Sequence, residues 1–469
     1  MIEFKQVSFS YEGSEEGKLR DINFSIKKGE CILLTGPSGC GKTTITRLIN
    51  GLIPEFFPGN LSGEIRVNGR RLQEEPIYRI AGTVGSVFQN PKTQFFNMDT
   101  DGEIAFGMEN NGIERALMKE RIRETAQELG LEKLLGRGIF SLSGGEKQKI
   151  AFASVYAMNP EVYLLDEPSS NLDEASIEEL RKHIELLKQQ GKTTVIAEHR
   201  IYYLAELADR IFYLNQGELQ HIWTREEFLQ LSEAERKRLG LRTVEYQNNT
   251  VPIDIKPVKA IEGKRKETIK FQDVTIGYGK QKVLTGINFD AAVGEIIAVT
   301  GQNGVGKSTF SRTLCGLLKP LEGNILWDLA SFKEKKRLAH SYMVMQDVNY
   351  QLFADSVKHE CSFGIKNPDY ELVEETLKEL NLYPYRNQHP NTLSGGQKQR
   401  VAVAVSMICK KKILIFDEPT SGLDYDSMQS VARLMKKLSQ AGKIIFVVTH
   451  DYEFIAEACT RILRLGAKD

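Results

Sequence analysis

The 469-residue sequence has no net charge, no paired cysteine motif and no long apolar run. Lys and Arg number 62, as do Asp and Glu, and this balance argues against a binder of nucleic-acid backbones, which is usually basic. The six cysteines form no CxxC pair, so a zinc or iron–sulfur site has no support and we expect reduced thiols. No apolar segment approaches the ~20 residues that span a bilayer. The first residues, MIEFKQVSFSYEG, alternate like a strand and lack the apolar core of a secretory signal. We therefore expect a cytosolic chain that reaches a membrane only through a partner.

The sequence has the composition of an ordinary globular protein, and its motifs occur twice along the chain. Hydrophobic residues make up 41% and charged residues 26%, which is typical of a protein with a packed core. The same landmarks recur in residues 1–228 and 269–469: GPSGCGKTT and GQNGVGKST, LSGGE and LSGGQ, YLLDEP and LIFDEP. The serines of LSGG lie 251 residues apart (394 − 143), as do the aspartates of YLLDEP and LIFDEP. We predict two tandem domains joined by a polar linker over 229–268, long enough to let the second copy face the first.

Short apolar runs predict the core of each copy. Residues 29–36 (GECILLTG) and 294–301 (GEIIAVTG) are typical of buried strands, each followed by a glycine loop and a helix from Lys42 or Lys307. The runs VYLLDE, ILIFDE, TTVIAEH and IIFVVTH predict further buried strands. Apolar runs without alternation suit a parallel sheet covered on both faces, which binds ligands at the carboxyl ends of its strands. An α/β fold follows.

The GxxxxGK[ST] loops predict a phosphate-binding site in each copy. Glycines let backbone N–H groups surround a phosphate, and the helix that follows adds its positive end. We expect Lys42 and Lys307 to reach the β- and γ-phosphates of ATP, and Thr43 and Ser308 to bind Mg²⁺. The expected nucleotide contacts in these loops are Gly36, Pro37, Ser38, Gly39, Cys40, Gly41, Lys42, Thr43 and Thr44, and Gly301, Gln302, Asn303, Gly304, Val305, Gly306, Lys307, Ser308 and Thr309.

Carboxylates end the next predicted strands. Asp166 and Asp417 are placed to hold Mg²⁺, directly or through water. Glu167 and Glu418 follow directly, where a carboxylate can orient and polarise the water that attacks the γ-phosphate. We interpret these four residues as the metal and catalytic carboxylates of two ATPase sites.

Other polar and aromatic side chains recur at matching positions. His199 and His450 follow the glutamates by 32 residues (199 − 167 and 450 − 418), and we interpret them as γ-phosphate sensors. Gln89 and Gln346 end strands with SVF and MVM, where an amide can contact Mg²⁺ or water and report occupancy. Tyr11 and Tyr278 precede the glycine loops and are placed to stack on adenine, although an aromatic residue in an edge strand is often only packing.

LSGGE (142–146) and LSGGQ (393–397) offer a further phosphate cradle, and with them the sequence resembles ATP-binding-cassette (ABC) proteins over nearly all of both copies. The resemblance implies two P-loop NTPase domains, each a mostly parallel sheet with an antiparallel β subdomain and a helical subdomain, paired head to tail. It also implies two shared ATP sites. ATP on Lys42 would be closed over by Ser394, Gly395 and Gly396, and ATP on Lys307 by Ser143, Gly144 and Gly145. The turns NLD and GLD resemble D-loops, so Asp173 and Asp424 would cross that interface.

Two departures from the family pattern occur in the first copy. Glu146 replaces the usual glutamine of LSGGQ, and EHR surrounds His199 where THD surrounds His450. Both copies retain the lysine, the aspartate, the glutamate and the histidine, so we expect two competent sites that are not necessarily equal.

A narrower resemblance follows the two glutamines. QNPKTQFF and QDVNYQLF share Q-x4-Q-x-F, and EIAFG and ECSFG share E-x-x-F-G. These stretches, with FGMENNGI and GNLSGEI, resemble the ATPases of energy-coupling-factor importers of vitamins and of cobalt or nickel. The resemblance implies a peripheral ATPase on the cytoplasmic face of the membrane, a transmembrane coupling subunit docked near residues 94–106 and 351–363, and a separate membrane subunit that selects the substrate. The alternative is that these aromatics only pack the helical subdomain.

Three other classes of cassette protein remain as alternatives. A fused sugar-importer ATPase typically has one degraded site, and neither is degraded here. A translation-type cassette protein acting on ribosomes needs a long charged helical linker, whereas the segment 229–268 is short and contains prolines. A DNA-repair type inserts coiled coils or zinc modules between P-loop and LSGG, and intervals of 101 (143 − 42) and 87 (394 − 307) residues leave no room.

Overall fold

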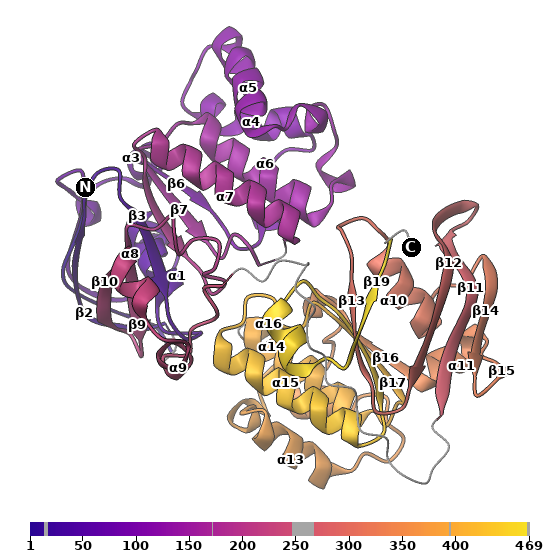
Figure 1. Cartoon of the computed structure of the whole chain (residues 1–469). Coiled ribbons are helices and arrows are strands. Elements are labelled where there is room, and N and C mark those ends of the chain that lie inside the picture. Colours follow the sequence, from indigo (N-terminus) through magenta and orange to yellow (C-terminus); the bar gives the residue numbers. More distant parts are fainter. Residues whose placement is uncertain (14–16, 171, 246–266, 394, 467–469) are drawn as a thin grey trace. The chain divides into compact units, whose positions relative to one another are not determined.

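The computed structural model describes residues 1–13, 17–170, 172–245, 267–393 and 395–466, and it divides into two units that follow the two copies (Figure 1). The strands of the first unit are β1 (Ile2–Tyr11), β2 (Leu19–Ile26), β3 (Cys31–Thr35), β4 (Gly59–Val67), β5 (Arg70–Arg71), β6 (Val84–Val87), β7 (Val162–Asp166), β8 (Thr193–Ala197), β9 (Arg210–Asn215) and β10 (Glu218–Thr224). Its helices are α1 (Lys42–Ile49), α2 (Leu52–Glu55), α3 (Ile77–Thr83), α4 (Thr100–Asn110), α5 (Arg115–Leu129), α6 (Gly144–Ala157), α7 (Glu174–Gln189), α8 (Arg225–Gln230) and α9 (Glu233–Arg238).

Two sheets form the first unit. A six-stranded sheet has the order β10-β9-β3-β8-β7-β6 and is parallel except for β10. An antiparallel sheet has the order β2-β1-β4-β5. Helices α4 and α5 pack on α6 and stand apart from the antiparallel sheet, as Figure 1 shows. The predicted core sheet, β subdomain and helical subdomain are therefore all present.

The central sheet is buried on both faces, as the apolar runs predict. On β3, Ile32 and Leu34 pack with the antiparallel sheet and α1, whereas Cys31 and Leu33 pack with α6 and α7. Strand β7 divides its side chains between the same two clusters. Because successive side chains point to opposite faces, a strand with apolar residues throughout serves both cores at once.

The second unit repeats this plan. Its strands are β11 (Thr268–Tyr278), β12 (Gln281–Ala292), β13 (Ile296–Thr300), β14 (Glu322–Trp327), β15 (Ala330–Ser331), β16 (Ser341–Val344), β17 (Ile413–Asp417), β18 (Ile444–Val448) and β19 (Arg461–Arg464). Its helices are α10 (Lys307–Cys315), α11 (Glu334–His340), α12 (Val357–Ser362), α13 (Tyr370–Glu379), α14 (Gly395–Ile408), α15 (Tyr425–Gln440) and α16 (Tyr452–Ala458). The parallel sheet has the order β16-β17-β18-β13-β19, which matches β6-β7-β8-β3-β9. The antiparallel sheet has the order β12-β11-β14-β15.

The segment predicted as a linker begins later than residue 229. Helix α8 runs across that boundary, and α9 follows it. Both helices end before residue 246. Leu241 is buried in the core of the first unit, and the hydroxyl of Tyr213 donates to the carbonyl of Leu239 at 2.8 Å. The polar composition hid this because only a few apolar side chains are needed to anchor two short capped helices. The remainder of the predicted linker, from 246 to 266, lies outside the described residues.

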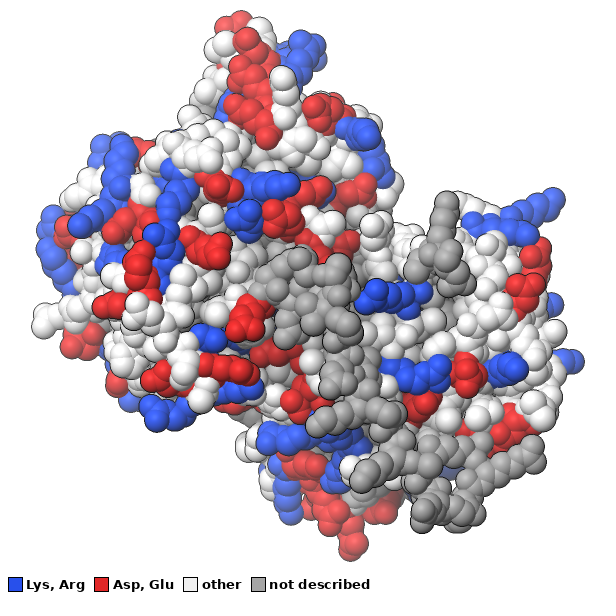
Figure 2. Space-filling view, viewed as in Figure 1, with Lys and Arg blue, Asp and Glu red and all other residues white. Residues whose placement is uncertain are grey.

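Acidic and basic side chains are interspersed on the face of the first unit that Figure 2 presents. This mixture is consistent with equal totals of the two charge types. Among the described helices, none combines the length and apolar character required to cross a bilayer.

Candidate functional site

Each glycine loop forms a turn that only glycine can make. Gly36 and Gly301 have φ values of 142° and 145°, and a Cβ on either would collide with the carbonyl of Leu214 or Leu465. A Cβ on Gly39 would instead meet open space. The loops therefore fold tightly against the sheet behind them and leave their front side open, as a phosphate cradle requires.

The loop lysines lie inside these cradles. Lys42 Nζ donates to the carbonyls of Gly36 and Pro37 at 2.9 and 3.1 Å. Lys307 Nζ makes the equivalent bonds to Gly301 and Gln302 at 2.7 and 3.1 Å. Each lysine is the first residue of its helix, α1 or α10. A buried cation beside a glycine loop and the N-terminus of a helix fits the β- and γ-phosphates of a nucleotide.

The magnesium candidates come together beside the lysine. Thr43 Oγ1 donates to Asp166 Oδ1 at 3.1 Å, which joins the start of α1 to the end of β7. Burial raises the pKa of Asp166, and it raises the pKa of Asp417 to about 6. A buried carboxylate with a raised pKa favours a cation nearby. A hydroxyl and a carboxylate next to a phosphate cradle are ligands that fit Mg²⁺.

Glu167 occupies a strained turn at the end of β7. Its φ is 45°, and Glu418 in the second unit has φ of 50°, in the left-handed region that non-glycine residues rarely adopt. The backbone N–H of Glu167 donates to the carbonyl of Ala197 at 2.8 Å, and that of Glu418 donates to Val448 at 2.8 Å. The same strain at both positions is typical of functional sites, where surrounding structure holds a side chain in place.

Three of the predicted catalytic side chains of the first unit converge. Gln89 Nε2 donates to Glu167 Oε2 at 2.5 Å, and His199 Nε2 lies 3.6 Å from Glu167 Oε1. Burial, followed by the charge of Asp166, raises the pKa of Glu167 to about 8. A carboxylate with a pKa near neutrality is suited to exchange a proton with water. Burial, followed by the charge of Lys42, lowers the pKa of His199, so its imidazole is neutral at pH 7.

The second unit places its residues in the same way. His450 Nε2 lies 3.9 Å from Glu418 Oε1, and Gln346 follows β16 as Gln89 follows β6. Gln346 is exposed in this structure. The paired motifs thus reach equivalent places, although the roles assigned to these residues stay predictions.

The tyrosines proposed for adenine are tied to the P-loop helices by their hydroxyl groups. Tyr11 lies 3.3 Å from Thr44 Oγ1 and accepts from Arg47 at 3.2 Å. Tyr278 is 44% exposed and accepts from Thr309 and Arg312 at 3.4 and 3.3 Å. Stacking on adenine stays a prediction, because these bonds fix the ring edges and do not show what covers their faces.

Arg47 and Arg312 were missed by the sequence reasoning. Each follows its P-loop lysine by five residues (47 − 42 and 312 − 307), and each lowers the pKa of the neighbouring aspartate by its charge. Their identical spacing in the two copies was the signal that could have found them.

The LSGG segments lie at the starts of helices α6 and α14. Ser143 caps α6: its hydroxyl accepts from Glu146 N at 3.3 Å, and its own N–H donates to Glu146 Oε2 at 2.7 Å. Arg137 donates to the other carboxylate oxygen at 2.7 Å. Glu146 thus forms a capping box, as glutamine also can, and its carboxylate adds an ion pair with Arg137. In the second unit α14 begins at Gly395, while Ser394 lies outside the described residues.

The proposed D-loop aspartates also stand at helix starts. Asp173 caps α7 by accepting from Ser176 N at 3.0 Å, and Asp424 directly precedes α15. Asn171, the first residue of the predicted NLD turn, lies outside the described residues.

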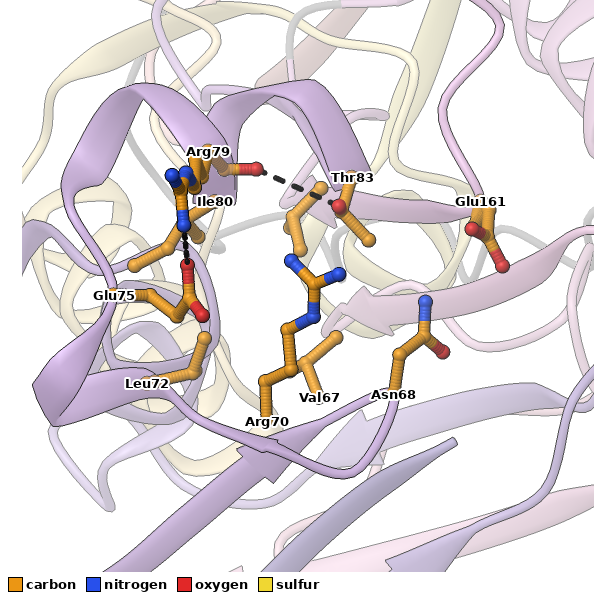
Figure 3. A pocket seen from close by; sticks show the side chains of 10 residues that line it. Val67, Asn68, Arg70, Leu72, Glu75, Arg79, Ile80, Thr83 and Glu161 are labelled. Atoms are coloured by element: carbon orange, nitrogen blue, oxygen red, sulfur yellow. Dashed lines mark hydrogen bonds and ion pairs between the residues drawn. The ribbon is translucent and has the colours of Figure 1, made fainter.

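A pocket of about 210 Å³ in the first unit is separate from this site. It lies between the turn that joins β4 to β5, the helix α3 and the start of β6 (Figure 3). Arg70 and Asn68 point into it, and Arg79 lies 3.7 Å from Glu75 at its rim. None of the predicted site residues lines it.

The sequence pattern of the ABC transporter family matches residues 19–170 and 284–421, which include both P-loops. This chain belongs to the ABC transporter family. Its two ABC domains are fused in one ATP-binding chain, and the family is one of ATPases that use ATP with Mg²⁺.

Similar proteins cover this ABC protein from end to end. A protein of Treponema denticola, provisionally named an ABC transporter ATP-binding protein, is 50% identical over 469 residues, which are 99% of this chain and 95% of that protein. A protein of Methanosarcina mazei with the same provisional name is 32% identical over 512 residues, with 99% and 87% covered. The solved structure titled "Model of ribosome-bound archaeal Pelota and ABCE1" matches with a TM-score of 0.69 and 22% identity, covering 98% of this chain and 76% of that one. This last likeness shows the tandem fold alone.

Proposed function

We propose that this ABC protein is the ATPase of an energy-coupling-factor importer, in which ATP hydrolysis drives uptake of a vitamin or a transition-metal micronutrient. A transmembrane coupling subunit receives the conformational change that ATP hydrolysis drives, and a separate membrane subunit selects the substrate. The observation that carries the proposal is a pair of exposed phenylalanines, Phe96 and Phe353, which lie seven residues after Gln89 and Gln346 (96 − 89 and 353 − 346).

The loop around each phenylalanine is braced by buried polar bonds. In the first unit, Gln94 bonds the backbone of Phe88 and Ser86, each at 3.2 Å. The buried Glu103 accepts from the N–H of Phe96 at 3.0 Å and from that of Asn97 at 2.9 Å. The second glutamine of Q-x4-Q-x-F and the glutamate of E-x-x-F-G are therefore structural residues that fix where Phe96 lies.

The second unit contains the same brace. Gln351 accepts from Met345 N at 3.0 Å, and Glu360 accepts from Phe353 N and Ala354 N, each at 2.7 Å. Phe96 is 73% exposed and Phe353 72% exposed. In each unit a buried carboxylate holds the backbone of a phenylalanine whose ring is exposed to solvent. This favours docking of a partner on the phenylalanine over the alternative that these aromatics only pack the helical subdomain.

An apolar groove adjoins Phe96 in the first unit. Its volume is about 250 Å³, and its walls include Leu52, Ile77, Phe106 and Met158. Phe96 stacks on Phe106 with ring centroids 4.9 Å apart, so the two rings form one wall. An amphipathic helix that inserts apolar side chains suits such a groove. This is the kind of segment that a transmembrane coupling subunit would present.

The catalytic cycle in this proposal uses the residues predicted from the sequence. The P-loop lysines hold the phosphates, Asp166 and Asp417 with the loop hydroxyls hold Mg²⁺, and Glu167 and Glu418 orient the attacking water. The LSGG segment of each domain closes over the nucleotide of the other. ATP then favours the paired state of the two domains, and hydrolysis removes that preference.

The test is purification of the full chain from detergent-solubilised membranes of its native host, with Phe96→Asp and Phe353→Asp as variants. We expect each variant to lose about tenfold or more of a co-purifying integral membrane protein while ATPase activity persists. Leu117→Asp, on the exposed face of α5, is the matched control and should lose nothing. Retention of the membrane protein by both phenylalanine variants would contradict the docking assignment. Recovery of ribosomes instead would support the translation-type alternative.

A further inference from the structure

A buried carboxylate adjoins the histidine of each ATP site in the sequence. It precedes the histidine in the first unit and follows it in the second. In the second unit this residue is Asp451, which follows His450. Asp451 Oδ2 accepts from Thr420 Oγ1 at 2.7 Å, and Oδ1 accepts from Phe454 N at 3.1 Å. Asp451 therefore ties the loop after β17 to the N-terminus of α16 and holds the histidine between them.

In the first unit the carboxylate belongs to Glu198, which precedes His199. Glu198 is 2% exposed. Its Oε1 accepts from the hydroxyl of Ser169 and from that of Tyr203, the latter at 2.9 Å. Its Oε2 accepts from the backbone N–H of His199 at 2.8 Å and of Arg200 at 3.4 Å. This carboxylate grips the histidine backbone directly.

The difference is a coordinated exchange at three positions of one register. Glu198, Arg200 and Tyr203 correspond to Thr449, Asp451 and Phe454, each 251 residues later. Tyr203 supplies the hydroxyl that Glu198 needs, where the second unit has a buried phenylalanine without one. Residues 202–207 form successive turns in place of a helix such as α16, because arginine at position 200 has no side-chain acceptor to cap one.

We propose that Glu198 is the positioning residue of the first ATP site. It holds His199 from the end of the preceding strand, whereas Asp451 holds the histidine of the second site from the start of the following helix. Glu198 fixes the backbone of His199, and His199 Nε2 lies 3.6 Å from Glu167. Glu167, the predicted catalytic glutamate, thus lies beside a histidine whose backbone is held by a second carboxylate.

The physical cost of this arrangement favours a functional role. Keeping a carboxylate 2% exposed requires several donors to replace its water, and Glu198 has five protein groups for this purpose, which include the backbone N–H of Ser169 at 3.3 Å. The second unit achieves the same fold of its strand β18 with a threonine at this position. The carboxylate is therefore not needed for the strand itself, and its bonds point to the loop that carries the histidine.

The test uses the full chain with ATP bound at both P-loops, and follows single-turnover hydrolysis after Mg²⁺ is added. Glu198→Thr should slow hydrolysis of at least half of the bound ATP by about 10- to 100-fold, the usual effect of losing an outer-shell partner. Affinity for ATP without Mg²⁺ should change less than about threefold, since the binding loop is untouched. Tyr203→Phe is the control, and should stay within about threefold of wild type because four donors to Glu198 remain.

Rescue separates positioning from folding. The triple variant Glu198→Thr, Arg200→Asp, Tyr203→Phe transplants the arrangement of the second unit, and should recover hydrolysis to within about threefold of wild type. Wild-type hydrolysis of all bound ATP by Glu198→Thr would overturn the proposal. So would a triple variant that melts like wild type but hydrolyses slowly. If Glu198→Thr alone does not fold, the rate of the triple variant decides. The outcome is independent of the membrane partner, so it is distinguishable from failure of the importer assignment.

Discussion

Replacing Glu167 by glutamine should make the stability of the first unit respond differently to pH. The Glu167 side chain is 13% exposed, and burial, followed by the charge of Asp166, raises its pKa from 4.5 to about 8. In the unfolded chain the same carboxyl has its ordinary pKa. Between pH 4.5 and 8 the folded protein therefore keeps a proton that the unfolded protein has released.

The sign and size of the effect follow from this difference. Because the folded state binds more protons in that window, the free energy of unfolding falls as pH rises and reaches its full loss above pH 8. At ~1.4 kcal/mol for each pKa unit, a rise from 4.5 to about 8 gives an upper limit of about 5 kcal/mol. Partial solvent access reduces this, and we expect about 2–4 kcal/mol. Glu167→Gln has no carboxyl to ionise, so its stability relative to wild type should increase by that amount from pH 5 to pH 9.

The assay is amide hydrogen exchange of β7 and β8 in the full chain, across this pH range and without nucleotide or Mg²⁺, corrected for the intrinsic exchange rate. These strands are in the buried core of the first unit and report its opening free energy. Glu120→Gln, which neutralises an exposed carboxylate on α5, is the control and should show no such dependence. A stability difference between Glu167→Gln and wild type that stays constant with pH, or that shrinks as pH rises, would refute the reasoning.

Three further predictions concern the same sites. Glu167→Gln and Glu418→Gln should bind ATP but slow its hydrolysis about 10²-fold or more, and normal turnover of the double variant in a phosphate-release assay would exclude the assigned role. Lys42→Ala should weaken nucleotide binding at the first P-loop only, measured by calorimetry, and equal weakening at both P-loops would instead reveal strong coupling. Glu103→Ala should lower the free energy of unfolding by about 1–3 kcal/mol, because two backbone N–H groups that include that of Phe96 lose their acceptor. An unchanged urea midpoint would contradict that last expectation.

The sequence by itself determined the fold and the positions of the motifs. Apolar runs ending in a glycine loop or in carboxylates left few alternatives to buried parallel strands, and β3, β7, β8 and their counterparts lie where the runs predict. Duplication strengthened each inference, because a residue that occurs at the same position in both copies is not explained by chance. This worked because the P-loop and the strand ends are local structures, whose geometry depends on neighbours in sequence.

Only the tertiary structure decided which polar residues brace these sites. The partner of Gln89 is Glu167, 78 residues away, and the partner of Glu198 is Ser169, on another strand end. From the sequence, EHR and THD differ mildly, but the structure shows the carboxylate before the histidine in one unit and after it in the other. In both units it accepts from the hydroxyl at one register, Ser169 or Thr420. Likewise, Glu103 looked like part of a family motif, and its buried bonds show that it holds a loop. Contacts between strand ends depend on the order of strands in the sheet, and one sequence read along its length does not contain that order.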